Sequence, residues 1–105
     1  MDDLTAKQRA HLRTLGHALK PVLHVGKEGV TKETAETLEE ALSKRELLKV
    51  RVLEAAPEPA RESAHDLASR VAGVKVVQVI GRTALVYRPH PEKPVIRLPH
   101  PRKRA

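Results

Sequence analysis

The apolar residues of this chain change period from segment to segment, and this alternation is what most constrains its fold. Segments with apolar residues three or four positions apart alternate with short segments rich in Val, Ile and Leu. Helical spacing predicts helices over 5–16, 31–44 and 59–72, whereas the apolar runs and alternation predict strands over 22–25, 47–53, 74–80 and 83–88. The predicted order is therefore α-β-α-β-α-β-β.

Local signals support these boundaries. Thr5 and Thr31 are suited to N-cap two of the helices, and Pro59 suits the first turn of the third. Gly81 and Arg82 form a two-residue hairpin loop, because glycine tolerates the positive φ that such turns require. Strands separated by helices favour parallel pairing through right-handed crossovers, and the final hairpin adds an antiparallel pair. We expect a single α/β domain with a mixed four-stranded sheet packed with three helices.

Composition predicts an aliphatic core and a separate tail. The 105 residues include no Phe, Trp or Cys, and Tyr87 is the only aromatic residue, so Leu, Val, Ile and Ala must fill the interior. We expect residues 1–88 to form the domain and residues 89–105, rich in Pro and basic residues, to form an extended C-terminal tail. Within that tail, 89–99 could dock on the domain through Val95, Ile96 and Leu98.

The same composition bears on the cellular compartment. No signal-peptide pattern is present at the N-terminus, and no apolar run approaches the ~20 residues that span a membrane. The absence of cysteine fits a reducing compartment. We therefore expect a cytoplasmic monomer that does not associate with membranes.

The charge indicates an anionic partner. The formal net charge is +7 and the pI is about 10.1. The first predicted helix is basic and the second carries an acidic outer face, so the charge is polarised. Arg9, Arg13 and His17 recur every fourth residue, ~6 Å apart along the helix, which is close to the spacing of phosphates along a nucleic-acid strand. The candidate electrostatic contacts here are Lys7, Arg9, Arg13 and Lys20.

A GxxG segment follows the first predicted strand and consists of Gly26, Lys27, Glu28 and Gly29. Glycines at both ends allow the backbone to approach a phosphate, and KH domains hold nucleic-acid backbones with such a loop. The alternative is an ordinary turn that needs glycine for its φ angles. Further basic residues on the predicted sheet and hairpin either contact RNA or keep an exposed strand soluble: Lys49, Arg51, Arg82 and Arg88.

Enzymatic and cofactor-dependent functions find no support in the motifs. The six histidines are scattered, without metal-ligand spacing, and neither a Walker loop nor GxGxxG is present. We predict no catalytic residue, no metal site and no cofactor. Because the chain also lacks the aromatic platforms on which bases stack, a nucleic acid would be held chiefly through phosphates, sugars and shape.

Four segments together resemble the YhbY family, the stand-alone bacterial form of the CRM (chloroplast RNA splicing and ribosome maturation) domain. They are LTAKQRAHLRTLGHALKP at 4–21, HVGKEGVT at 24–31, LLKVRV at 47–52 and VQVIGRTALVYR at 77–88. The resemblance implies a fold similar to the C-terminal domain of translation initiation factor three, with the GxxG loop as an RNA contact. Family members commonly carry Asn or Asp near Glu28, so we expect this longer acid to point away from RNA.

The resemblance also implies a function, namely binding to ribosomal RNA in precursors of the large ribosomal subunit, without catalysis. Two alternatives remain open at this point. The charge is also compatible with a DNA-binding architectural protein, and scattered histidines are compatible with a small histidine-dependent ribonuclease. Comparing binding to RNA and duplex DNA, and RNA integrity without metal, would separate the three.

Overall fold

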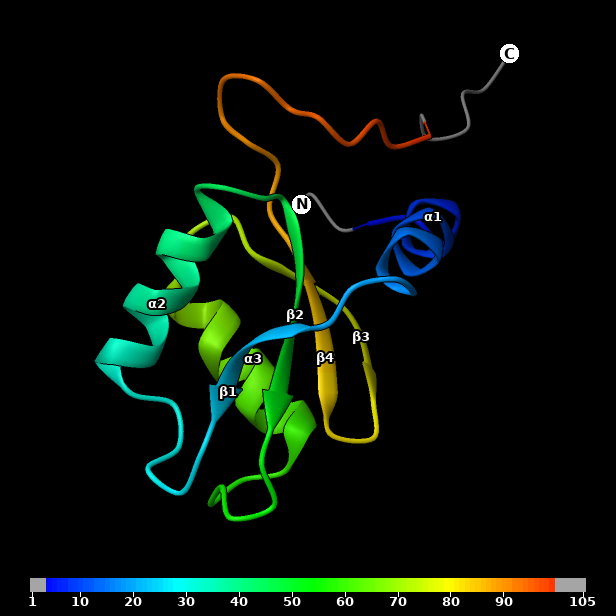
Figure 1. The fold of residues 1–105 in the computed structure, drawn as a ribbon. Helices are drawn as coiled ribbons and strands as arrows, with labels where there is room; N and C mark the ends of the chain where they lie inside the picture. The colour runs from blue at the N-terminus through cyan, green and yellow to red at the C-terminus, as the bar shows by residue number, and fades with distance from the viewer. Residues whose placement is uncertain (1–3, 100–105) are drawn as a thin grey trace.

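The computed structural model describes residues 4–99 (Figure 1). It confirms the predicted α-β-α-β-α-β-β order. The basic residues expected at the end of the tail, Arg102, Lys103 and Arg104, lie outside the described residues. The elements are α1 (Ala6–Gly16), β1 (Pro21–Val25), α2 (Lys32–Leu42), β2 (Leu47–Val52), α3 (Ala60–Arg70), β3 (Lys75–Ile80) and β4 (Thr83–Tyr87).

Side-chain caps begin the first two helices. The Thr5 hydroxyl accepts a hydrogen bond from the Gln8 N–H at 3.0 Å, and the Gln8 side chain accepts one from the Thr5 N–H at 3.0 Å. Thr31 and Thr34 form the same reciprocal arrangement at the start of α2. At the hairpin, Gly81 has a φ of +58°. α1 and α2 therefore start directly after the threonine that caps each of them, whereas α3 starts after Pro59 without a side-chain cap.

The sheet is mixed, with strand order β1-β2-β4-β3. β1 and β2 are parallel, whereas β4 pairs antiparallel with both β2 and β3. β1, β2 and β3 consequently run in the same direction and end at the same edge of the sheet (Figure 1). This edge, which we call the loop edge, carries the connections 26–31 and 53–59 and the hairpin loop 81–82.

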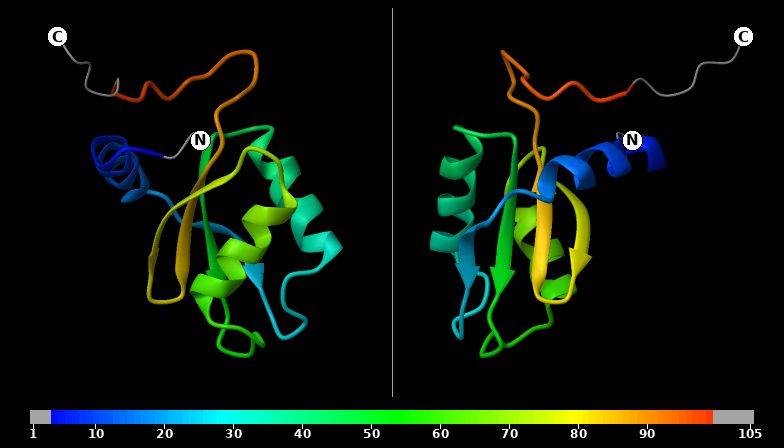
Figure 2. Two further views of the ribbon diagram at one scale, coloured as in Figure 1. Left: turned by 180° about the vertical axis from the view of Figure 1, so that it is seen from behind. Right: turned by 45° about the vertical axis from the view of Figure 1, so that its right-hand side comes forward.

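Helices cover both faces of the sheet, but unequally. Figure 2 shows α2 and α3 on one side, the rear face, and α1 on the other, the front face. The rear core contains the larger set of buried aliphatic residues, among them Leu38, Leu67 and Val86. The front cluster is smaller and consists of Leu12, Leu47, Val77, Leu85 and Tyr87. None of the helices within residues 4–99 is long and apolar enough to cross a membrane.

A glycine lets α1 lie close to β4. A Cβ atom at Gly16 would stand 2.9 Å from both δ-carbons of Leu85, closer than side chains tolerate. Leu12, one turn earlier, is fully buried in the front cluster. The 11-residue helix is thus fixed over one half of the front face, and the other half stays uncovered.

A buried carboxylate holds the segment 90–96 against the domain. Glu46 lies just before β2 and is only 6% exposed. Its Oε2 accepts a hydrogen bond from the His90 N–H at 2.6 Å, and its Oε1 accepts from the N–H groups of Val95 (3.0 Å) and Ile96 (2.7 Å). Ile96 and Leu98 pack against the front cluster. We call this arrangement the Glu46 clasp.

The clasp favours the ionised form of Glu46. Burial by itself raises the pKa of a carboxyl group, but here the three backbone N–H donors outweigh it and hold the pKa of Glu46 below its ordinary value of 4.5. A carboxyl group whose pKa is lower in the folded state stabilises the fold above its unfolded pKa, and this contribution disappears as the pH falls through the folded pKa.

We expect Glu46→Gln to lower the free energy of unfolding by about 1–3 kcal/mol at pH 7, because it removes charge-assisted hydrogen bonds to three donors. The difference between the two proteins should shrink as the pH falls below 4.5, because the unfolded wild-type chain then takes up a proton at Glu46 more readily than the folded protein does. Urea unfolding measured from pH 7 down to about pH 3 tests this. Glu40→Gln, on the exposed face of α2, is the matched control. A difference that persisted undiminished in acid would show that the charge of Glu46 does not hold the clasp.

Candidate nucleic-acid interface

The GxxG segment forms a tight turn at the loop edge. The N–H of Gly29 donates to the carbonyl of Gly26 at 2.9 Å, so Lys27 and Glu28 occupy the exposed tip. Among the described residues, the N–H groups of Lys27 and Glu28 have no hydrogen-bond acceptor. The tip therefore carries two backbone donors and the ammonium group of Lys27, which can bind an anion, and also the exposed carboxylate of Glu28.

The two glycines are required for different reasons. Gly29 is buried, has a φ of +75°, and a Cβ there would approach the Cγ of Pro57 to 3.0 Å. At Gly26 φ is not positive, and the nearest atom to an added Cβ would be 3.9 Å away. The conformation of the turn thus requires glycine at position 29 but not at position 26. At Gly26 the absence of a side chain leaves the backbone open to a ligand.

The uncovered half of the front face contains a hollow of about 330 Å³ between the end of α1 and the hairpin. We call it the front hollow; its lining residues are His17, Pro21, Lys49, Arg51, Gln78, Ile80, Thr83 and Leu85. Lys49 and Arg51, both predicted from the alternation of β2, project into it. None of the described lining residues is a carboxylate.

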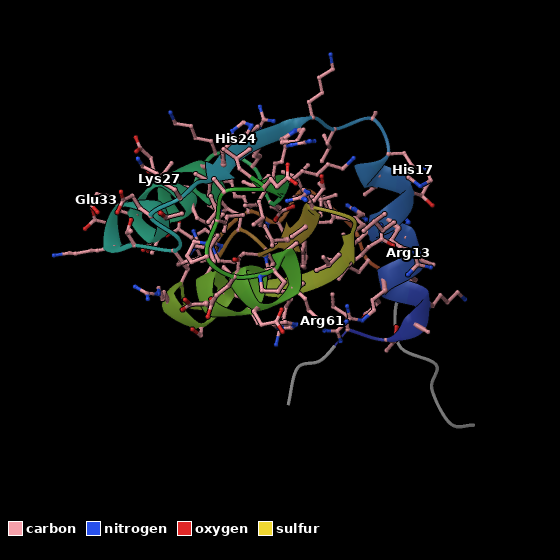
Figure 3. The ribbon with its side chains drawn as sticks, turned by 90° about the horizontal axis from the view of Figure 1, so that it is seen from below. Arg13, His17, His24, Lys27, Glu33 and Arg61 are labelled. Carbon is pink, nitrogen blue, oxygen red and sulfur yellow. The ribbon has the colours of Figure 1, made fainter. Side chains whose placement is uncertain are left out.

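The basic side chains of the front hollow continue to the GxxG loop. His24 on β1 is exposed and is the register partner of Arg51, and the loop begins two residues later. Figure 3 shows His17, His24 and Lys27 along the side of the molecule that carries α1 and β1, with Arg13 farther along α1; Arg61 of α3 lies across the view from His24. We call this surface the basic face: Arg13, His17, His24, Lys27, Lys49 and Arg51.

Arg9, predicted as a free phosphate contact, is engaged within the protein. Its Nη1 donates to the carbonyls of Val76 at 2.9 Å and Val77 at 2.7 Å, on the edge strand β3. Lys7 is exposed, but a separation of two residues places it roughly 200° around the helix from Arg9. The basic stripe expected on α1 is therefore divided among an internal contact, the basic face and the outer side of the helix.

The remaining predicted residues lie outside the basic face, and two of them are close to carboxylates. Lys20 is exposed in the connection between α1 and β1. Arg82 lies at the hairpin, 3.5 Å from the carboxylate of Glu54. Arg88 points to the rear, where its Nη1 is 3.9 Å from the Glu39 carboxylate. The structure brings Lys27, Lys49, Arg51 and Arg13 to one face but does not bring Arg88 to it.

The opposite charge is gathered on α2. Four glutamates are exposed along this rear-face helix: Glu33, Glu36, Glu39 and Glu40. An anionic ligand would be repelled from this helix and attracted to the basic face. The polarisation predicted from the sequence is thus a property of the folded surface.

No catalytic arrangement is visible in the described part of the chain. Within residues 4–99, no three His, Cys, Asp or Glu side chains cluster as metal ligands would. Asp66, which neighbours His65 on α3, forms an ion pair with the guanidinium of Arg70 at 3.0 Å.

Comparisons with known proteins identify a domain family and similar chains. Residues 4–88 match the CRS1 / YhbY (CRM) domain. The "Probable RNA-binding protein YqeI" of Bacillus subtilis is 38% identical over 96 residues, which cover 91% of this chain and 99% of that protein. The "Probable RNA-binding protein PA4753" of Pseudomonas aeruginosa is 38% identical over 89 residues, 85% of each chain. The solution structure of a Staphylococcus aureus protein, described as a candidate RNA-binding protein, superimposes with a TM-score of 0.77 at 35% identity and covers 92% of this chain and 100% of that one.

The unequal roles of the two glycines lead to a stability test. We expect Gly29→Ala to lower the free energy of unfolding by at least about 1–2 kcal/mol, because an L-residue is strained at positive φ and its Cβ meets Pro57. Gly26→Ala should change it by less than about 0.5 kcal/mol. Urea unfolding of both variants checks this. Equal losses would mean that the turn needs both glycines for its conformation.

Proposed function

This chain belongs to the CRS1 / YhbY (CRM) domain family, and from that premise we propose that it is a non-enzymatic RNA-binding protein. The observation that carries the proposal is the basic face, which joins an open GxxG tip to cationic side chains of α1 and the sheet. The naming of its relatives YqeI and PA4753 as probable RNA-binding proteins supports RNA as the partner.

Binding through this surface is chiefly electrostatic. The N–H groups at the GxxG tip and the ammonium group of Lys27 contact phosphate oxygens, and the missing Cβ at Gly26 allows the backbone to approach. Arg13, Lys49 and Arg51 extend the contact along the same strand of RNA. Each phosphate neutralised releases condensed counterions, so affinity falls steeply with salt.

The proposal extends to ribosomal RNA in precursors of the large ribosomal subunit, bound by a cytoplasmic monomer without a cofactor. Its supports are the resemblance of four segments to YhbY proteins and a net charge of +7 suited to a polyanion. Crosslinking the protein to RNA in cells and sequencing the attached RNA tests this assignment. Enrichment of another RNA class would overturn the ribosomal part of the proposal and leave RNA binding intact.

Duplex DNA is the alternative ligand that the charge also permits. Binding to a structured RNA and to a DNA duplex of matched sequence, at equal salt, separates the two. We expect tighter binding to RNA, and RNA of unchanged length after incubation without metal. Preference for DNA would favour an architectural role, and cleavage of the RNA would favour a ribonuclease.

We expect Lys27→Ala and Arg13→Ala each to reduce the slope of log affinity against log salt by roughly 0.7–0.9, the contribution of one phosphate contact. Filter binding or fluorescence anisotropy at several salt concentrations measures the slope. Arg61→Ala is the matched control, because Arg61 is an exposed cation of α3, the helix that covers the rear face of the sheet. If all three variants shared the wild-type slope while remaining folded, the basic face would not be the RNA-binding surface.

A further inference from the structure

An irregularity in β3 places two consecutive side chains on the front face. The pairing of β3 with β4 shifts register between Val76 and Gln78. Val77 is buried in the front cluster and Gln78 lines the front hollow, whereas Val76 and Val79 pack against the rear core. Side chains of a regular strand alternate between faces, so without this bulge Gln78 would face the rear.

The bulge also determines where Ile80 lies. Because the alternation restarts at Gln78, Val79 faces the rear and Ile80 faces the front hollow, where it is 65% exposed. A regular strand would have placed Ile80 in the rear core and removed its side chain from the front hollow. The bulge thus exposes one amide and one aliphatic side chain beside Lys49 and Arg51.

Arg9 holds the bulge in place. Its two hydrogen bonds go to the carbonyls of Val76 and Val77, the residues at which the register shifts. β3 is an edge strand, so one of its sides has no neighbouring strand. Successive carbonyls of a regular strand point to opposite sides, and the irregularity at Val76 and Val77 lets both of theirs bond to Arg9. Arg9 therefore acts as a positioning residue for Gln78 and Ile80.

The groups of the front hollow suit a nucleobase better than a bare phosphate. Ile80 offers an apolar surface, and the planar guanidinium of Arg51 can stack on a base. The Gln78 amide offers a donor and an acceptor to a base edge. Lys49 supplies a cation for the attached phosphate. The volume of about 330 Å³ is at the small end for ligand sites.

We propose that the front hollow holds one unpaired nucleotide of the bound RNA, with the base between Ile80 and Arg51 and its edge read by Gln78. The proposal rests on the proposed RNA-binding function and specifies its substrate class, namely RNA with an unpaired nucleotide next to a structured region. A base within a continuous duplex is stacked between its neighbours and cannot enter such a hollow.

The test compares two RNAs that differ by a single nucleotide, a duplex with one bulged nucleotide and the same duplex with that nucleotide paired. We expect the wild-type protein to prefer the bulged RNA. Gln78→Ala and Ile80→Ala should each weaken binding to this RNA by about 5- to 20-fold, because the first removes a hydrogen bond and the second an apolar contact. Neither substitution removes charge, so the salt slope and the affinity for paired RNA should be unchanged. Thr37→Ala, an exposed position on α2, is the matched control.

The outcomes separate this inference from the function on which it rests. Salt-dependent binding of both RNAs that is insensitive to Gln78→Ala and Ile80→Ala would overturn the nucleotide site and leave RNA binding in place. Failure of the wild-type protein to bind either RNA would overturn both. Circular dichroism and urea unfolding verify that the variants are folded, which we expect because both side chains are at least partly exposed.

A double variant tests the role of Arg9. If Arg9 acts through the position of Gln78, then Arg9→Ala combined with Gln78→Ala should weaken binding to the bulged RNA by less than the product of the two single effects. An Arg9 that contacted phosphate independently would give multiplied losses and a lower salt slope. That result would overturn the positioning role.

Discussion

Two hydrogen bonds from the guanidinium of Arg9 join α1 to the bulge of β3, and much of the front face is organised around this contact. They fix the helix at the sheet edge, while Leu12 and the close approach at Gly16 fix it over β4. Because α1 has only 11 residues, it cannot also cover the sheet beside the hairpin. The same contact therefore secures the helix and shapes the surface that the helix leaves open.

The interior is almost wholly aliphatic, and hydrogen bonds from individual side chains supplement its packing. The rear core, with α2 and α3 packed on it, contains most of the buried apolar residues. The front cluster is small and is completed by Ile96 and Leu98 of the C-terminal segment. Aliphatic packing on this side is supplemented by directional contacts, namely those of Arg9 with β3 and those of Glu46 with the backbone of 90–96.

The order of helices and strands could be predicted because each element carries its own period and its own boundary signal, such as Thr5, Thr31 or Gly81. The role of Arg9 could not be predicted from the sequence. Basic residues one turn apart are also typical of a solvated helix face. The partners of Arg9 are backbone carbonyls at a bulge, the first of them 67 residues away in the sequence. Glu46 was missed for a similar reason, since main-chain donors more than 40 residues away have no sequence signature. The alternation of β2 indicated Lys49 and Arg51 of the front hollow, and the polar Gln78 within a β-branched strand was a further sign of it.

The Glu46 clasp has a consequence for how this sequence can change over time. All three of its donors are main-chain N–H groups, which every residue except proline possesses. The side chains at 90, 95 and 96 can therefore be exchanged without loss of these bonds, whereas Glu46 itself has few substitutes. The prolines of this segment occur at 89, 91, 94 and 99, and none occupies a donor position. For these three hydrogen bonds, mutational drift along the segment has one condition, that proline stays out of positions 90, 95 and 96; the packing of Ile96 against the front cluster is a separate constraint.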